Sequence, residues 1–143
     1  MAMAYTVREL TDAEKEAFLT DNYWGVLSFA GDDPYGIPVG YMYRKGDVLM
    51  GLSPTGRKME YVTKSRTVCF TICRPAALCR ATAQSPDPNE AYPFNTVIIE
   101  GELENVTDRA YYGLESQTEG FTGGLFRIKQ KRVGTQQLGL SSR

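Results

Sequence analysis

Residues 35–58, YGIPVGYMYRKGDVLMGLSPTGRK, contain the pattern that decides the fold of this chain. Apolar and aromatic residues predict a strand over 35–44, and the turn at 45–47 leads to a second strand over 48–52. Pro38 lies inside the first strand and has no N–H to donate. It therefore marks a sheet edge, a bulge or a place where a ligand approaches the backbone.

The junction between this hairpin and the helix that follows has the features of an anion-binding site. Arg57 and Lys58 stand in the first helical turn, where free N–H groups and the positive end of the helix dipole also favour an anion. Ser53 and Thr55 belong to the loop before it. A P-loop needs Lys directly after its second Gly, then Ser or Thr, and the Gly56-Arg57-Lys58 order excludes that motif. We expect a phosphate-bearing ligand, with two solvated surface cations as the alternative.

The rest of the chain predicts a mainly β protein. Further strands are expected over 23–30, 67–74, 94–106 and 125–133, and short helices over 11–20, 57–65 and 107–117. Thr11 and Glu14 have capping-box spacing, which begins the first helix, and Phe18 and Leu19 are its core candidates. Many strands joined by hairpins, with few helices, indicate a barrel or sandwich rather than an α/β layer fold.

The domain organisation is predicted to be simple. A single domain is expected over residues 1–143, with an N-terminal helical segment over 1–22 and a polar tail over 134–143. The stretch 75–93 is expected to be a long irregular loop, which in a small domain is either functional or disordered.

Composition excludes several classes of function. The formal net charge of -1 argues against a general nucleic-acid binder, and no apolar run approaches membrane-spanning length. With three Cys and no signal-peptide pattern, a cytoplasmic location with reduced thiols is expected. Histidine is absent, which excludes Ser-His-Asp and Cys-His catalysis and every His-containing metal site. Cys69, Cys73 and Cys79 fit no zinc spacing, so we expect no metal and interpret these residues as inert thiols.

Several segments together resemble the pyridoxamine-phosphate-oxidase-like FMN-binding split-barrel family, and most closely its nitroimidazole-resistance branch. They are Tyr35–Tyr43, Gly56-Arg57-Lys58, Val68-Cys69-Phe70 and Asn95–Gly101. The resemblance implies a six-stranded antiparallel split β-barrel. It also implies a homodimer that holds FMN at the subunit interface.

The same resemblance implies roles for particular residues. Arg57 and Lys58 match the residues that grip the FMN phosphate. The other matched positions line the isoalloxazine ring, the strand end beneath it, the phosphate loop or a small hydroxyl position near the cofactor: Pro38, Val39, Gly40, Tyr41, Gly51, Leu52, Ser53, Thr55 and Thr96. The nitroimidazole-resistance branch typically has histidine where Gly51 stands, so activities that use that histidine are not expected.

The expected function is that of an FMN-dependent oxidoreductase, passing electrons from a reductant such as NAD(P)H through FMN to a small organic acceptor. No catalytic side chain is assigned. The alternatives are a non-catalytic flavin store, sensor or electron carrier, a split-barrel protein that uses deazaflavin or haem, and a barrel interaction module without a cofactor. The lack of histidine weakens the haem alternative, although Cys, Met or Tyr can also ligate haem iron.

Overall fold

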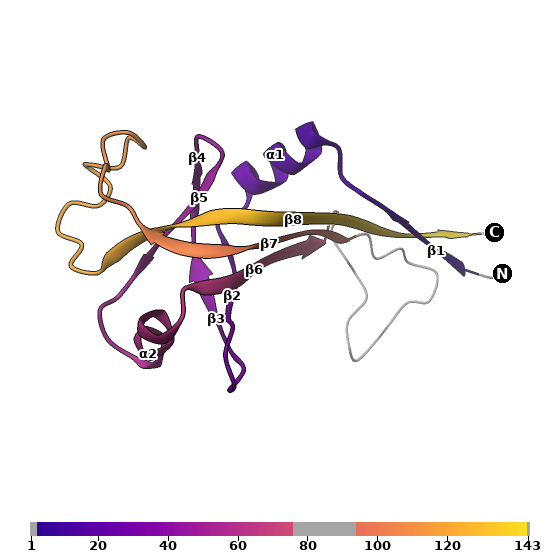
Figure 1. Ribbon diagram of the computed structural model, residues 1–143. Coiled ribbons are helices and arrows are strands. Elements are labelled where there is room, and N and C mark those ends of the chain that lie inside the picture. The colour runs from indigo at the N-terminus through magenta and orange to yellow at the C-terminus, as the bar shows by residue number, and fades with distance from the viewer. Residues whose placement is uncertain (1–2, 76–93, 143) are drawn as a thin grey trace, which may run out of the picture.

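The described part of the chain, residues 3–75 and 94–142 of a computed structural model, forms eight β-strands and two α-helices (Figure 1). In chain order they are β1 (Met3–Arg8), α1 (Asp12–Asp21), β2 (Trp24–Phe29), β3 (Tyr35–Gly40), β4 (Met42–Arg44), β5 (Asp47–Leu52), α2 (Arg57–Lys64), β6 (Thr67–Pro75), β7 (Phe94–Asn105) and β8 (Gly124–Ser142). The strands form one antiparallel sheet in the order β3-β2-β6-β7-β8-β5-β4, and β1 pairs with β8.

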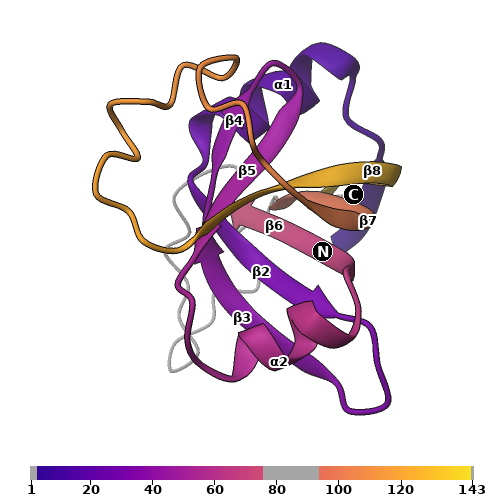
Figure 2. The ribbon, with the colours of Figure 1, turned by 60° about the vertical axis from the view of Figure 1, so that its left-hand side comes forward.

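The sheet curls into a barrel with an open side. Strand β3, at one end of the sheet order, also approaches β5 near the other end (Figure 2). The helices α1 and α2 lie at opposite ends of the shorter strands in both views. The predicted mainly β split barrel is therefore confirmed.

The strand count differs from the six expected because one predicted strand is divided and β1 was not foreseen. The strand predicted over 35–44 breaks at Tyr41, which separates β3 from β4. The Tyr41 N–H donates to the carbonyl of Tyr23 (2.8 Å), and its hydroxyl donates to the carbonyl of Leu19 (2.8 Å). These bonds hold the buried tyrosine at the corner where the chain leaves β3 and enters β4.

The main core lies inside the curl, where alternate residues of each strand point. Phe18 and Leu19 of α1 are buried there as predicted, and Val62 of α2 closes the other end. The fully buried side chains of this core include Leu27, Val48, Met50, Phe70, Ile72, Val97, Ile99, Leu103 and Ile128.

A second, smaller cluster lies on the outer face of β5 and β8. Leu49 and Leu125 of these strands pack there against Tyr112 and Leu114 from the segment 106–123. This segment, orange in Figure 2, loops beside β4 and β5. This outer cluster covers part of the outer face of β5 and β8.

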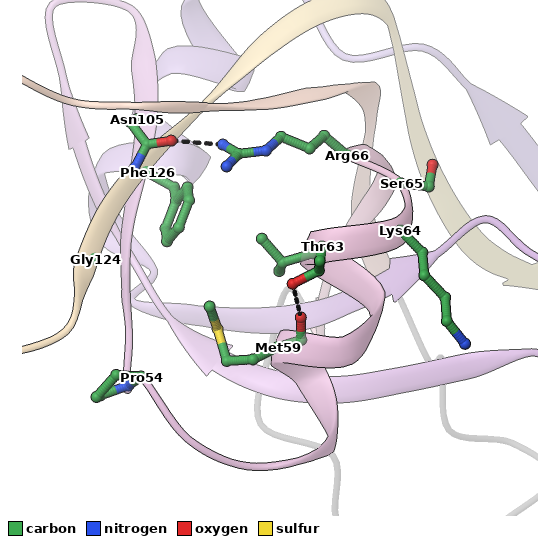
Figure 3. Close-up of a pocket in the computed structure, with 10 residues that line it drawn as sticks. Pro54, Met59, Thr63, Lys64, Ser65, Arg66, Asn105, Gly124 and Phe126 are labelled. Atoms are coloured by element: carbon green, nitrogen blue, oxygen red, sulfur yellow. Dashed lines mark hydrogen bonds between the residues drawn. The ribbon is translucent and has the colours of Figure 1, made fainter.

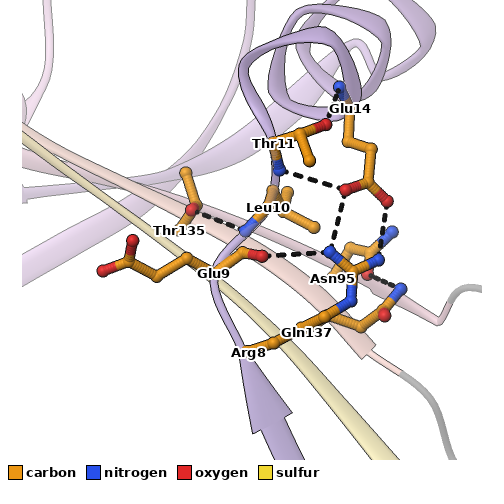
Figure 4. A network of polar contacts seen from close by, with 8 residues as sticks. All are labelled: Arg8, Glu9, Leu10, Thr11, Glu14, Asn95, Thr135 and Gln137. Carbon is orange, nitrogen blue, oxygen red and sulfur yellow. Dashed lines mark hydrogen bonds and ion pairs between the residues drawn. The ribbon is translucent and has the colours of Figure 1, made fainter.

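A polar network fastens the N-terminal elements to the long strands (Figure 4). Thr11 caps α1, and its backbone N–H donates to the Glu14 carboxylate at 3.0 Å, so the predicted capping box is present. The same carboxylate accepts two hydrogen bonds from Arg8, at 2.7 and 2.8 Å. Between them, the Leu10 N–H donates to the hydroxyl of Thr135 on β8 (3.0 Å), which ties the β1–α1 linker to the sheet.

Two predicted segments are corrected by the structure. The helix expected over 107–117 is absent, and this part of the chain forms successive turns, with Gly113 at a φ of 68°. The polar tail expected over 134–143 is instead a continuation of β8 to Ser142, because its backbone pairs with β7 on one side and β1 on the other. The irregular loop expected over 75–93 lies, except for its first residue, outside the described residues.

Candidate functional site

The start of α2 places a guanidinium against two stacked aromatic rings. Tyr35 of β3 and Tyr61 of α2 stack with ring centroids 4.7 Å apart and planes at 11°. The Arg57 guanidinium carbon lies 5.3 Å and 5.9 Å from these two centroids, and Arg57 donates to the Tyr61 hydroxyl at 3.3 Å. The guanidinium is a permanent cation, and that hydrogen bond raises the pKa of Arg57 further.

The helix start leaves its backbone donors without a side-chain cap. Gly56 is the N-cap residue, at a φ of 102°, and makes no capping hydrogen bond. The Lys58 ammonium folds back and donates to the Thr55 carbonyl at 2.7 Å, beside the exposed Ser53. Neither Arg57 nor Lys58 pairs with a carboxylate among the described residues. Two unpaired cations beside uncapped N–H groups fit a phosphate group.

Strand β3 presents an open backbone next to this helix start. It lies at the end of the sheet order, so one of its sides has no partner strand in the described structure, as the edge interpretation of Pro38 requires. Its outer face carries Gly36, Pro38 and Gly40, all exposed, while Val39 points into the core. A strand with so little side-chain bulk lets a planar ligand approach its backbone.

Two other predicted site residues contribute no exposed side chain. Tyr41 is buried against Phe70 in an edge-to-face contact, and burial raises the pKa of Tyr41 to about 12. Leu52 belongs to the main core. Like Val39, these residues can contact a cofactor only through their backbone.

Gly51 lies at the exposed end of β5, and an aromatic ring covers the place of its missing side chain. A Cβ atom at Gly51 would lie 2.9 Å from the ring of Phe121. The sequence did not single out Phe121, because a helix was predicted over 107–117 and nothing indicated where the chain beyond it would return. The only signal was an aromatic residue among glycines, at positions 120, 123 and 124.

Thr96 lies away from the helix start. It pairs with Cys73 of β6 and donates its hydroxyl to the Cys73 sulfur at 3.3 Å. Through its pairing with β6, Thr96 is level with the Trp24 end of β2. Tyr35, whose ring contacts the Arg57 guanidinium, pairs with Phe29 at the opposite end of β2. At about 3.3 Å per residue, these ends lie roughly 17 Å apart. The structure therefore groups the helix start, β3 and the end of β5, and leaves Thr96 outside that group.

A cleft of about 480 Å³ lies on another face of α2 (Figure 3). Arg66 extends across it, donates to the Asn105 side chain at 2.6 Å and lies over the ring of Phe126 at 5.5 Å. A neighbouring cleft shares the Pro54 and Met59 part of this lining and reaches the loop at Thr55 and Gly56. A groove thus follows α2 from its start to Arg66, a residue that the sequence analysis did not select.

Comparisons with known proteins agree with the class of protein that this fold defines, a small split-barrel protein. The chain belongs to the pyridoxamine 5'-phosphate oxidase family, whose model matches residues 11–124. This confirms the family resemblance. A search of the curated proteins finds no match.

Solved structures share the fold at low sequence identity. A FAD-binding protein from Mesorhizobium loti superposes with a TM-score of 0.67 at 22% identity, covering 92% of this chain and 97% of that one. A candidate 5-nitroimidazole antibiotic resistance protein from Bacteroides thetaiotaomicron gives 0.68 at 15% identity, covering 98% and 91%. A heme-binding protein from Mycobacterium smegmatis gives 0.63 at 16% identity, covering 87% of this chain and 53% of that one.

Among the described residues, neither helix is both long and apolar enough to cross a bilayer.

Proposed function

We propose that this protein is a homodimeric flavoprotein that binds FMN at its subunit interface and acts as an oxidoreductase. The observation that carries the proposal is the start of α2, where Arg57, Lys58 and uncapped N–H groups lie beside the open strand β3. When bound, FMN supplies two-electron redox chemistry between a reduced nicotinamide cofactor and a small organic acceptor. Family membership and the FAD-binding structural neighbour support a flavin as the cofactor.

Different residues of the site would bind different parts of FMN. Arg57 offers a planar fork for two phosphate oxygens, and its stacking on Tyr35 and Tyr61 fixes the fork in place. Lys58 adds a second charge from the same helical turn. The backbone of Pro38 and its neighbours on β3 offers hydrogen-bonding groups to the polar edge of the isoalloxazine ring.

A dimer accounts for the separation of Thr96 from the helix start. Four residues form a continuous row across the outer face of the sheet, because the strand registers pair Val26 with Pro38 and with Thr71, and Thr71 with Ile98. In this outer row Val26 and Ile98 are 37% and 38% exposed. Packing the row against a second subunit would bury it, and Thr96, two residues from Ile98, would lie at that interface.

The proposed redox reaction must obtain its proton without a histidine side chain. The chain has no histidine at all, and no described side chain near the helix start is assigned as an acid or base. The required proton would come from water or from the substrate. The alternative is a non-catalytic flavin store or carrier, and a measurement of turnover distinguishes it from an enzyme.

A dinucleotide flavin is a second candidate, favoured by the groove along α2. The groove begins at Thr55 and Gly56 and ends at Arg66, whose planar guanidinium can stack on a base. If FAD binds at least tenfold more tightly than FMN, and Arg66→Ala removes the difference, FAD replaces FMN in the proposal.

The primary test is an absorbance titration of the purified protein with FMN, followed by gel filtration. We expect the flavin spectrum to elute with the protein. Failure to bind FMN and FAD overturns the flavin proposal, and retention of haem or deazaflavin instead would identify another cofactor. Oxidation of NADH or NADPH by the loaded protein with a panel of acceptors then tests catalysis, and no turnover with any acceptor favours the non-catalytic alternative.

The phosphate site is tested by the double variant Arg57→Ala/Lys58→Ala. Hydrogen bonds to charged groups are worth about 1.5–3 kcal/mol, so FMN should bind at least tenfold more weakly. Riboflavin, which lacks the phosphate, should bind as it does to the unchanged protein. The control variant Lys129→Ala/Lys131→Ala removes two cations from β8 and should leave both affinities unchanged. Equal losses for FMN and riboflavin would contradict the assigned roles.

A further inference from the structure

The ring of Phe121 packs against the backbone of two glycines at the edge of the candidate site. It lies where a Cβ atom at Gly51 would be 2.9 Å away, and a Cβ atom at Gly123 would be 2.6 Å from the ring. The ring can occupy this position only because both residues lack a side chain. The Phe121 residue is nevertheless 39% exposed, so part of the ring remains open beyond the glycines.

The segment that carries Phe121 is anchored, so the position of the ring is built into the fold. Leu114 is completely buried in the outer cluster, and the Tyr112 hydroxyl donates to Asp47 of β5 at 2.6 Å. Thr118 is also buried, and it receives a hydrogen bond from Arg109 at 3.1 Å. The N–H of Phe121 then donates to the carbonyl of Thr118 at 3.1 Å, shortly before the chain enters β8 beside β5.

The ring also lies on the side of β5 that faces away from the barrel. Met50 and Leu52 point into the main core, while Gly51 shares the outer direction of Leu49. Gly51 is followed by the loop that leads directly to the start of α2. Phe121 thus supplies, from a separate segment, an aromatic group at the place that a side chain of residue 51 would otherwise occupy.

We propose that Phe121 is a positioning residue for the flavin, forming an apolar wall beside the isoalloxazine ring at the end of β5. The inference rests on the proposed flavin function. A planar aromatic ring gives the cofactor an offset or edge contact and keeps water from that side of it. The ring of Phe121, which comes from another segment, thus takes the place of a side chain at Gly51 on β5.

The first test uses fluorescence to measure proximity. In Phe121→Trp, an indole in contact with the bound flavin should quench flavin emission, so emission per bound FMN should fall below that of the unchanged protein. Tyr111→Trp is the matched control. It is an exposed aromatic position in the same segment, lying over Lys45 rather than over Gly51, and its emission should equal that of the unchanged protein.

The second test uses affinity and rescue. Phe121→Ala should weaken FMN about two- to tenfold, the range expected for the loss of one aromatic contact. In Gly51→Phe/Phe121→Ala the ring returns from β5 itself, and FMN affinity should recover. A purely structural role for Phe121 would be shown by lost stability without this recovery. Circular dichroism and the urea midpoint of each variant monitor folding.

The outcomes separate this inference from the proposed function. If the unchanged protein binds FMN, but Phe121→Ala binds it equally well and Phe121→Trp does not alter its emission, the role of Phe121 is wrong and the flavin proposal stands. If the unchanged protein binds no flavin, both are overturned.

Discussion

Glu14 joins β1 to the start of α1 through one carboxylate. It completes the capping box of α1 with Thr11 and accepts two hydrogen bonds from Arg8 of β1. The hydrogen bonds from Arg8, followed by that from the Thr11 backbone, lower the pKa of Glu14 to about 2. The capping spacing was visible in the sequence, but the partner from β1 was not, because no strand was expected before the helix.

This shift predicts a particular pH dependence of stability. In the unfolded chain Glu14 protonates near its ordinary pKa of 4.5, and in the folded chain only near 2. Its contribution is therefore fully present above about pH 4.5 and is lost as the pH falls toward 2. The urea midpoint of Glu14→Gln should lie below that of the unchanged protein at pH 7, and the difference should shrink on acidification. Glu115→Gln, an exposed control, should show no such trend, and a pH-independent difference for Glu14→Gln would contradict the linkage.

The segment 106–123 shows how an element can be set by tertiary contacts rather than by local sequence. Leu114 is fully buried between this segment and the outer face of β5 and β8. Leu114→Ala should cost about 2–4 kcal/mol of unfolding free energy, since it removes buried methyl groups and leaves a cavity. Hydrogen exchange should accelerate most in this segment. The neighbouring exposed Glu115→Ala should change neither quantity, and uniform acceleration across all strands would show that the segment is not a separate unit.

The segment 106–123 also shows which elements could not be predicted from the sequence. The pattern gave the hairpin at Gly46 and both real helices to within one or two residues, because turn and capping chemistry is local. Tyr112 and Leu114 are two residues apart and would lie on different faces of a helix, yet a chain of turns buries both side chains. Likewise, the polar stretch after Val133 has little apolar patterning, and its strand depends on pairing with β7 and β1.

At the scale of the whole molecule, the candidate site was predicted in parts. Arg57 and Lys58 could be selected because a helix start has a local signature, and the family resemblance supplied the strand positions. Tyr61, Phe121 and Arg66 could not be selected, since their roles arise only when α2 and the segment 106–123 fold against other elements. Their discovery requires the packed barrel.

The proposed dimer gives the last prediction, because in that proposal each site draws on both subunits. Ile98 stands in the outer row, opposite Thr71, and is 38% exposed. A charge there would remain solvated in a monomer but would be buried without a partner in a dimer, which is strongly unfavourable. Ile98→Arg should therefore convert a dimer to a monomer in analytical ultracentrifugation. It should also lower FMN affinity, because each site would lose the partner's half.

The control for this prediction is Asp32→Arg, which adds the same side chain in the exposed turn between β2 and β3 and should leave both mass and affinity unchanged. Circular dichroism of the Ile98→Arg monomer should retain the β signal, because the outer row contributes nothing to the core inside the curl. A protein that is monomeric before substitution and binds FMN tightly would contradict the interface site. A dimer that survives Ile98→Arg would instead place the interface on another face of the barrel, and Thr96 would then lose its proposed connection to the cofactor.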